Sequence, residues 1–125
     1  MIGYVTMGTS DVQKAAAFYD GLLELLGGKR IMDEESFIAW GAAPGAPGIG
    51  VTKPFDGKPQ SVGNGMMVAL AAGSSEMVDA LHARALELGG SDEGAPGARS
   101  ETFYAGYFRD LDGNKLCAFH MPGMG

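Results

Sequence analysis

The feature that most constrains this chain is an internal repeat that occupies both halves of its sequence. Each half contains a short apolar strand, serines that can cap a helix, an amphipathic helix and a Gly-Gly pair that ends the helix, in that order. The two copies are offset by about 63 residues, which is half of the chain. Such a repeat predicts two modules with the same fold rather than two unrelated domains.

The two helices are the best-defined elements of the repeat. The first copy predicts a strand over 2–7 and a helix that starts at Ser10, with Gln13 at the capping-box position. The second copy predicts a strand over 66–71 and a helix capped at Ser74 and Ser75, with His82 on its solvent side. The predicted buried faces have the helical period and consist of Val12, Ala15, Ala16, Tyr19, Leu22, Leu23 and Leu26, and of Met77, Val78, Leu81, Ala85 and Leu88.

Strand-forming segments follow each helix. In the first half they cover 29–34, 36–42 and 48–55; in the second half a Gly/Pro-rich loop over 90–101 precedes strands over 102–110 and 115–120. The pattern predicts an α+β fold of two tandem βαβββ modules that form one curved mixed sheet, with the helices outside and a cleft inside. We expect a single domain, 1–125, with module one at about 1–55, a linker at about 56–65 and module two at about 66–122.

Composition excludes several classes of function. The net charge of −6 and the scattered Lys and Arg argue against nucleic acid, and they favour a neutral or cationic ligand if the charge matters at all. No apolar run approaches the roughly 20 residues that span a bilayer, so we expect no membrane partner. The only cysteine cannot form an internal disulfide, which fits a cytoplasmic location.

Three segments in the right order on this repeated frame carry a family resemblance. They are "YVTMGTSDVQKAAAFYDGLLELLG", "PFDGKPQSVGNGMMVAL" and "YFRDLDGNKLCAFH". The chain resembles the glyoxalase/bleomycin-resistance/extradiol-dioxygenase superfamily, which has the vicinal-oxygen-chelate fold. The resemblance covers essentially the whole chain. It implies a divalent metal in the cleft, held by His and Glu side chains on the first and closing strands of the two modules.

Carried over residue by residue, the ligand positions hold other side chains. The resemblance places Tyr4 and Met67 at the two His positions and Cys117 at a closing-strand Glu position. The corresponding ligand of the first half would lie around 51–53, which contains no carboxylate or imidazole. A phenol, a thioether and a thiol are not the ligands that hard divalent cations prefer. We therefore predict no bound metal of the usual kind and no cofactor.

The same positions suggest a binding cleft instead. The candidate cleft residues are Tyr4, Trp40, Met67, Tyr107, Cys117 and Phe119, an aromatic and sulfur-rich set that suits apolar or planar ligands. The alternative is that these side chains simply fill the interior. Cys117 is expected to be an inert lining residue rather than a nucleophile. Arg109 is expected to be a salt-bridged surface group, and Asp110 and Asp112 to serve the turn through Asp112-Gly113-Asn114.

Three functions remain open from the sequence. The first is a protein without metal that binds a small, partly apolar or aromatic molecule, as the resemblance to the bleomycin-resistance branch implies. The second is a lyase or isomerase of the lactoylglutathione-lyase type, or a ring-cleaving dioxygenase, with an atypical site. The third is an enzyme that runs acid/base chemistry with Tyr4 or Cys117. The resemblance and the exposed edges of two small sheets also imply a homodimer.

Overall fold

The structure, a computed structural model, describes residues 1–123 and consists of two modules with the same order of elements. Module one contains β1 (Tyr4–Gly8), α1 (Val12–Leu23), the short 3₁₀ helix η1 (Glu24–Leu26), β2 (Lys29–Asp33), β3 (Phe37–Gly41) and β4 (Gly48–Thr52). Module two contains β5 (Val68–Ala71), α2 (Ser75–Glu87), β6 (Ser91–Ala98), β7 (Tyr104–Arg109) and β8 (Lys115–His120). The predicted α+β class and the βαβββ repeat are confirmed.

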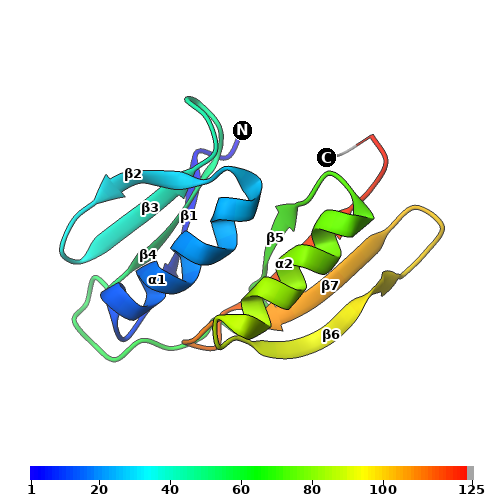
Figure 1. Cartoon of the computed structure of the whole chain (residues 1–125). Coiled ribbons are helices and arrows are strands. Elements are labelled where there is room, and N and C mark those ends of the chain that lie inside the picture. The colour runs from blue at the N-terminus through cyan, green and yellow to red at the C-terminus, as the bar shows by residue number, and fades with distance from the viewer. Residues whose placement is uncertain (124–125) are drawn as a thin grey trace.

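Each module has its own four-stranded mixed sheet. The strand orders are β1-β4-β3-β2 and β5-β8-β7-β6, with the first strand of each module parallel to the last and the other pairs antiparallel. Both helices cover the same side of the molecule, with the sheets behind them (Figure 1). The cleft was expected inside one curved sheet. The structure has two sheets instead, and β1 and β5 each hydrogen-bond along only one of their edges.

Helix α1 begins one residue later than the sequence predicts. Asp11 is the N-cap, and its side chain accepts a hydrogen bond from the backbone N–H of Lys14 at 3.1 Å. Ser10, the predicted cap, instead donates its backbone N–H and its hydroxyl to Asp112 Oδ1, both at 2.9 Å. The predicted apolar face is buried apart from the partly buried Leu26, and Phe18 is buried as well.

Helix α2 has the predicted cap but an unexpected buried histidine. Ser74 accepts a hydrogen bond from the backbone N–H of Met77 at 3.1 Å, as its sequence position indicated. His82 was predicted to face solvent, yet it is only 6% exposed and its Nε2 lies 2.9 Å from Asp92 Oδ1. The prediction was wrong because the partner lies on β6, a strand that the helix pattern does not reveal.

Strand β6 occupies most of the segment that was predicted to be a loop. Residues 91–98 pair with β7, but the register shifts between Asp92 and Gly94 and again between Gly94 and Gly97. Glycine and proline in this segment are tolerated because β6 is an edge strand with bulges. Composition alone indicated a loop, and pairing with β7 overrode it.

The two modules share one hydrophobic core, and their helices touch. The helices approach closely at Gly21, where an added Cβ would lie 3.0 Å from the Leu88 side chain. Arg84 of α2 donates from Nη1 to the Gly21 carbonyl at 2.7 Å. Buried side chains of both modules form a single cluster, which includes Tyr19 and Phe108. The helix contact therefore fixes how the modules sit against each other.

The turn between β7 and β8 is a second link between the modules. Asp110 is 6% exposed and accepts a hydrogen bond from the Tyr19 hydroxyl of α1 at 2.6 Å. Its carboxylate also accepts from the side chain of Asn114 and from the backbone N–H groups of Asp112 and Asn114. Asn114 in turn donates to the Gly8 carbonyl of β1 at 2.9 Å. Asp110 thus serves the turn as predicted and joins the modules as well, whereas the Asp112 side chain bonds to Ser10 of module one instead of to the turn.

No helix within residues 1–123 is long and apolar enough to cross a membrane.

Both strands that begin a module are shorter than predicted, since β1 spans Tyr4–Gly8 and β5 spans Val68–Ala71. The segment between β4 and β5 contains neither helix nor strand, and it includes the linker that the sequence placed at about 56–65.

Candidate functional site

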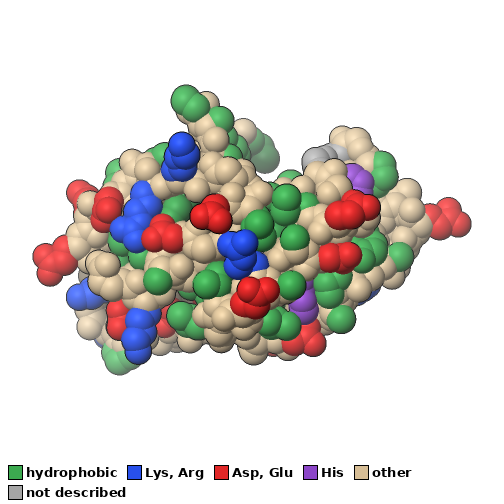
Figure 2. Space-filling view, in the orientation of Figure 1, with side chains coloured by type: hydrophobic (Ala, Val, Ile, Leu, Met, Phe, Trp, Pro, Cys, Tyr) green, Lys and Arg blue, Asp and Glu red, His purple; other side chains and the backbone are tan. Residues whose placement is uncertain are grey.

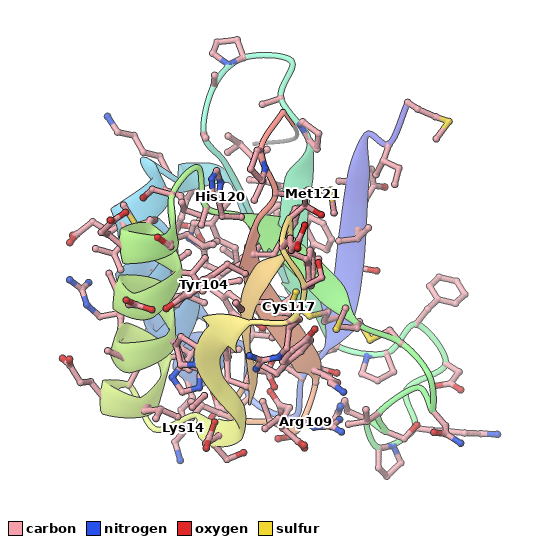
Figure 3. The ribbon with its side chains drawn as sticks, turned by 90° about the vertical axis from the view of Figure 1, so that its right-hand side faces the viewer. Lys14, Tyr104, Arg109, Cys117, His120 and Met121 are labelled. Carbon is pink, nitrogen blue, oxygen red and sulfur yellow. The ribbon has the colours of Figure 1, made fainter. Side chains whose placement is uncertain are left out.

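Each sheet has one face against its helix and one face turned away from it, which we call the open face. On β1 the side chains of Val5 and Met7 pack toward α1, so Tyr4 and Thr6 lie on the open face. On β8 Leu116 and Ala118 belong to the shared core, whereas Lys115, Cys117 and Phe119 alternate onto the open face. Figure 3 shows Tyr104 on the helix side of the second sheet and Cys117 on the other side.

Two of the three family ligand positions are exposed and one is buried. Tyr4 is 65% exposed at the start of β1, and Met67 is 43% exposed just before β5. Cys117 is 1% exposed, although it lies on the open face. Tyr4 and Met67 occupy equivalent places in the repeat. Each lies seven residues before the N-cap of its helix, which is Asp11 for α1 and Ser74 for α2.

The position in module one that corresponds to Cys117 is Gly50. Cys117 pairs with Ala69 on β5, and the equivalent of Ala69 on β1 is Thr6, which pairs with Gly50. The sequence placed this ligand position around 51–53, so that placement was wrong by one residue. An added Cβ at Gly50 would lie 3.1 Å from the Phe37 ring, which leaves little room for a side chain there.

These residues do not fit a divalent metal. Burial raises the pKa of the Cys117 thiol, and the nearby Lys115 ammonium opposes that shift only in part, so the thiolate form is disfavoured. Within residues 1–123 no three His, Cys, Asp or Glu side chains lie close enough to hold an ion. His82 is engaged with Asp92 between α2 and β6, away from the open faces. The high pKa also argues against Cys117 as an activated nucleophile.

Trp40 lies on the helix side of β3 and not on the open face with Tyr4. Its indole Nε1–H donates to Asp20 Oδ1 of α1 at 2.8 Å, and its ring centre lies 5.6 Å from that of Tyr19. Trp40 is 1% exposed. The sequence grouped Trp40 with Tyr4 and Met67 in one lining, and the structure separates Trp40 from Tyr4 because the strand register turns its side chain toward α1.

Tyr107 and Phe119 do share the open face with Cys117. Tyr107 is the register partner of Cys117 on the neighbouring strand β7. Phe119 stacks on Phe103, with ring centres 5.8 Å apart and an interplanar angle of 23°. Phe103 was not among the predicted site residues, because it precedes β7 in the segment whose structure depends on β6. The sequence did contain a signal for Phe103. It lies two positions before Ala105, so in a continued strand both side chains would lie on the same face.

An apolar cavity lies between the modules. It has a volume of about 510 Å³ and is lined from module one by η1, β3, β4 and the start of β1, and from module two by β5. In the space-filling view the molecule is hollowed at its upper edge between the two modules (Figure 2). The side chains that line the apolar cavity include those of Ile2, Val5, Leu26, Trp40, Ile49, Met67, Val68 and Leu70. Trp40 and Met67 are therefore the predicted site residues that border this cavity.

A second cavity is more polar and lies where the linker meets module two. It has a volume of about 620 Å³ and is lined by 62–67 together with Arg109 and Lys115. Arg109 donates from Nε to Glu93 Oε1 at 2.6 Å, as expected for a salt-bridged surface group. Met67 lines both cavities, so the two adjoin at this side chain.

The comparisons with known proteins agree with the geometry. A sequence profile described as the Glyoxalase/Bleomycin resistance protein/Dioxygenase superfamily matches residues 1–118. No functionally curated protein matches the chain.

Solved structures with this fold are similar over nearly the whole chain. A glyoxalase/bleomycin resistance protein from Albidiferax ferrireducens T118 is 39% identical, with 98% of this chain and 99% of that chain covered and a TM-score of 0.90. A glyoxalase-related enzyme from Fulvimarina pelagi is 19% identical, with 98% of this chain and 88% of that chain covered and a TM-score of 0.78. At 19% identity, the similarity to the Fulvimarina pelagi protein shows a shared fold and nothing more.

Proposed function

The chain belongs to the glyoxalase/bleomycin resistance protein/dioxygenase superfamily, and because Tyr4, Met67 and Cys117 do not fit a divalent cation, we propose that it binds a small, partly apolar or aromatic molecule. The observation that carries this proposal is the cavity of about 510 Å³ between the modules. Its volume lies in the range of small-molecule sites, and its walls are largely aliphatic.

The composition of the walls supports an apolar ligand. Val5 and Leu26 contribute from module one, and Val68 and Leu70 from module two, so a bound molecule would contact both modules. Met67 is a flexible and polarizable side chain that adapts to different ligand shapes. Trp40 borders the cavity and is the only tryptophan of the chain. Its fluorescence therefore provides a direct signal of occupancy.

Replacing Met67 with alanine tests the binding site. We expect the wild-type protein to bind a neutral aromatic probe, 2-naphthamide, and the Met67→Ala variant to bind it about fivefold more weakly, because about 1 kcal/mol of apolar contact is lost. Isothermal titration calorimetry measures both affinities. Met32→Ala is the matched control, since Met32 is 47% exposed on β2 and lines neither cavity, against 43% for Met67.

Two results would contradict the proposal. One is equal loss of affinity in the Met67→Ala and Met32→Ala variants, which would place the probe elsewhere. The other is stoichiometric metal in the purified protein, with lyase, isomerase or dioxygenase activity that depends on added divalent ions. That result would favour a metal enzyme with an atypical set of ligands.

We also propose a homodimer, which the open face of the first sheet supports. Tyr4 is 65% and Ile31 63% exposed there, and Phe55 after β4 is fully exposed to solvent. Contiguous exposed apolar side chains are typical of surfaces that a partner covers. Size-exclusion chromatography with light scattering is expected to give about twice the monomer mass of 12.9 kDa. A mass equal to that of the monomer would rule the dimer out.

A further inference from the structure

The open face of the second sheet carries a cluster of three cations. Arg109 and Lys115 are register partners on β7 and β8, so their side chains are neighbours across the strands. The Arg99 guanidinium lies 5.4 Å and the Lys115 ammonium 5.5 Å from the centre of the Tyr107 ring. Three cations therefore gather on this face, one of them paired with Glu93, although the chain carries a net charge of −6.

The cations differ in how far they are neutralised. Arg109 is paired with Glu93, and its Nη1 also donates to the Gly113 carbonyl at 3.0 Å. No carboxylate within residues 1–123 forms a salt bridge with Lys115, whose ammonium contacts the face of the Tyr107 ring. Lys115 therefore keeps a positive charge that a bound anion could neutralise.

Lys115 lines the cavity where the linker meets module two. The charged residues that line this cavity are Arg109 and Lys115, and the remaining lining is the segment 62–67. Figure 3 shows Arg109 at the lower end of the second sheet, on the same side as Cys117. Gly63, Asn64 and Gly65 add backbone groups without bulky side chains. A small anionic group could thus approach the lysine closely.

The basic cavity and the apolar cavity have one lining residue in common. Met67 lines both, and beyond it the apolar cavity is bounded by Val68 and Leu70 of β5. A ligand with one charged end could place that end beside Lys115 while its apolar body passes Met67. A cationic ligand would instead meet Lys115 and Arg109 as like charges.

We propose that the ligand of this protein is an organic anion, a molecule with an apolar or aromatic body and a carboxylate that is bound by Lys115 beside Arg109. The inference rests on the proposed function and names the ligand class of the same site. It differs from the expectation drawn from net charge, which favoured a neutral or cationic molecule. The local arrangement of charges outweighs the distant ones, because exposed charges beyond about 10 Å are largely screened in physiological salt.

Three probes of the same shape test the proposal: 2-naphthoate, neutral 2-naphthamide and cationic 2-naphthylmethylamine. Calorimetry is expected to show that the wild-type protein binds the carboxylate at least about tenfold more tightly than the amide, and the amine most weakly. In the Lys115→Gln variant the preference for the carboxylate over the amide is expected to fall about tenfold. Lys115→Arg is expected to retain it.

Lys58→Gln is the matched control, because Lys58 is an exposed linker lysine that lines neither cavity and its replacement makes the same change in net charge. It is expected to keep the wild-type preference, and thermal unfolding checks that the variants fold equally well. An unchanged preference in Lys115→Gln, or equal binding of all three probes, would overturn the inference and leave the proposed function standing. Binding of none of the probes would overturn both.

Discussion

Replacing Asp110 with alanine is expected to lower the free energy of unfolding by about 3–5 kcal/mol, a large fraction of the stability of a domain of this size. The carboxylate is buried and accepts four hydrogen bonds, one of them from the Tyr19 hydroxyl of the other module. The alanine variant would leave these donors without a partner in the interior, where an unsatisfied group costs about 1–3 kcal/mol. Urea unfolding followed by Trp40 fluorescence measures the loss.

Two further variants compare the individual hydrogen bonds that join the turn to module one. Asp112→Ala removes bonds to Ser10 at the surface and is expected to cost about 1 kcal/mol or less. Tyr19→Phe removes the bond that joins α1 to Asp110 and the weaker contact of the same hydroxyl with Met7 Sδ, and it is expected to cost about 1–2 kcal/mol. If Asp110→Ala proves no more destabilising than Asp112→Ala, the buried Asp110 carboxylate is not the stronger of these two links between the modules.

Replacing Trp40 with alanine is expected to cost about 3–5 kcal/mol as well, for a different reason. The indole is 1% exposed, packs 5.6 Å from the Tyr19 ring and donates to Asp20, so its removal leaves a cavity and takes one donor from Asp20, which Arg30 still pairs. Circular dichroism during thermal or urea unfolding measures the effect, since the variant has no tryptophan signal. Trp40→Phe retains part of the packing and is expected to cost less.

Tyr4→Ala is the control for Trp40→Ala, because the sequence assigned both aromatic residues to one cleft lining. Tyr4 is 65% exposed on the open face of the monomer, and its replacement is expected to change the stability of the monomer by about 0.5 kcal/mol or less, measured at protein concentrations at which the dimer dissociates. Equal costs for the two variants would mean that Trp40 is not a core residue. A native fluorescence spectrum of Trp40 like that of the unfolded chain would lead to the same conclusion.

The candidate site could be predicted from the sequence only in part. The family resemblance placed Tyr4, Met67 and Cys117 on the first and closing strands; Tyr4 lies on β1 and Cys117 on β8, whereas Met67 lies just before β5. It could not identify the burial of Cys117, the positive open face or the cavity at Met67. Arg99, Arg109 and Lys115 come from three separate segments, and only strand pairing brings them around Tyr107.

The errors share one physical cause. Trp40 was placed on the wrong face and His82 was placed in solvent, and each is held by a carboxylate from another element, Asp20 and Asp92. Gly/Pro content indicated a loop where β6 pairs with β7. In each case a partner distant in the sequence decided the outcome, and local propensity carries no information about such partners.

By itself the sequence determined the two-module architecture, the two helices and the turn before β8. These features depend on local rules: the helical period of apolar side chains, a serine or aspartate at the N-cap, and glycine where the backbone turns. Only the tertiary structure decided which faces of the sheets remain open, how Asp110 ties the modules together and where Lys115 meets an apolar cavity. Those features arise from strand register and from contacts between residues up to 106 positions apart, such as Gly8 with Asn114.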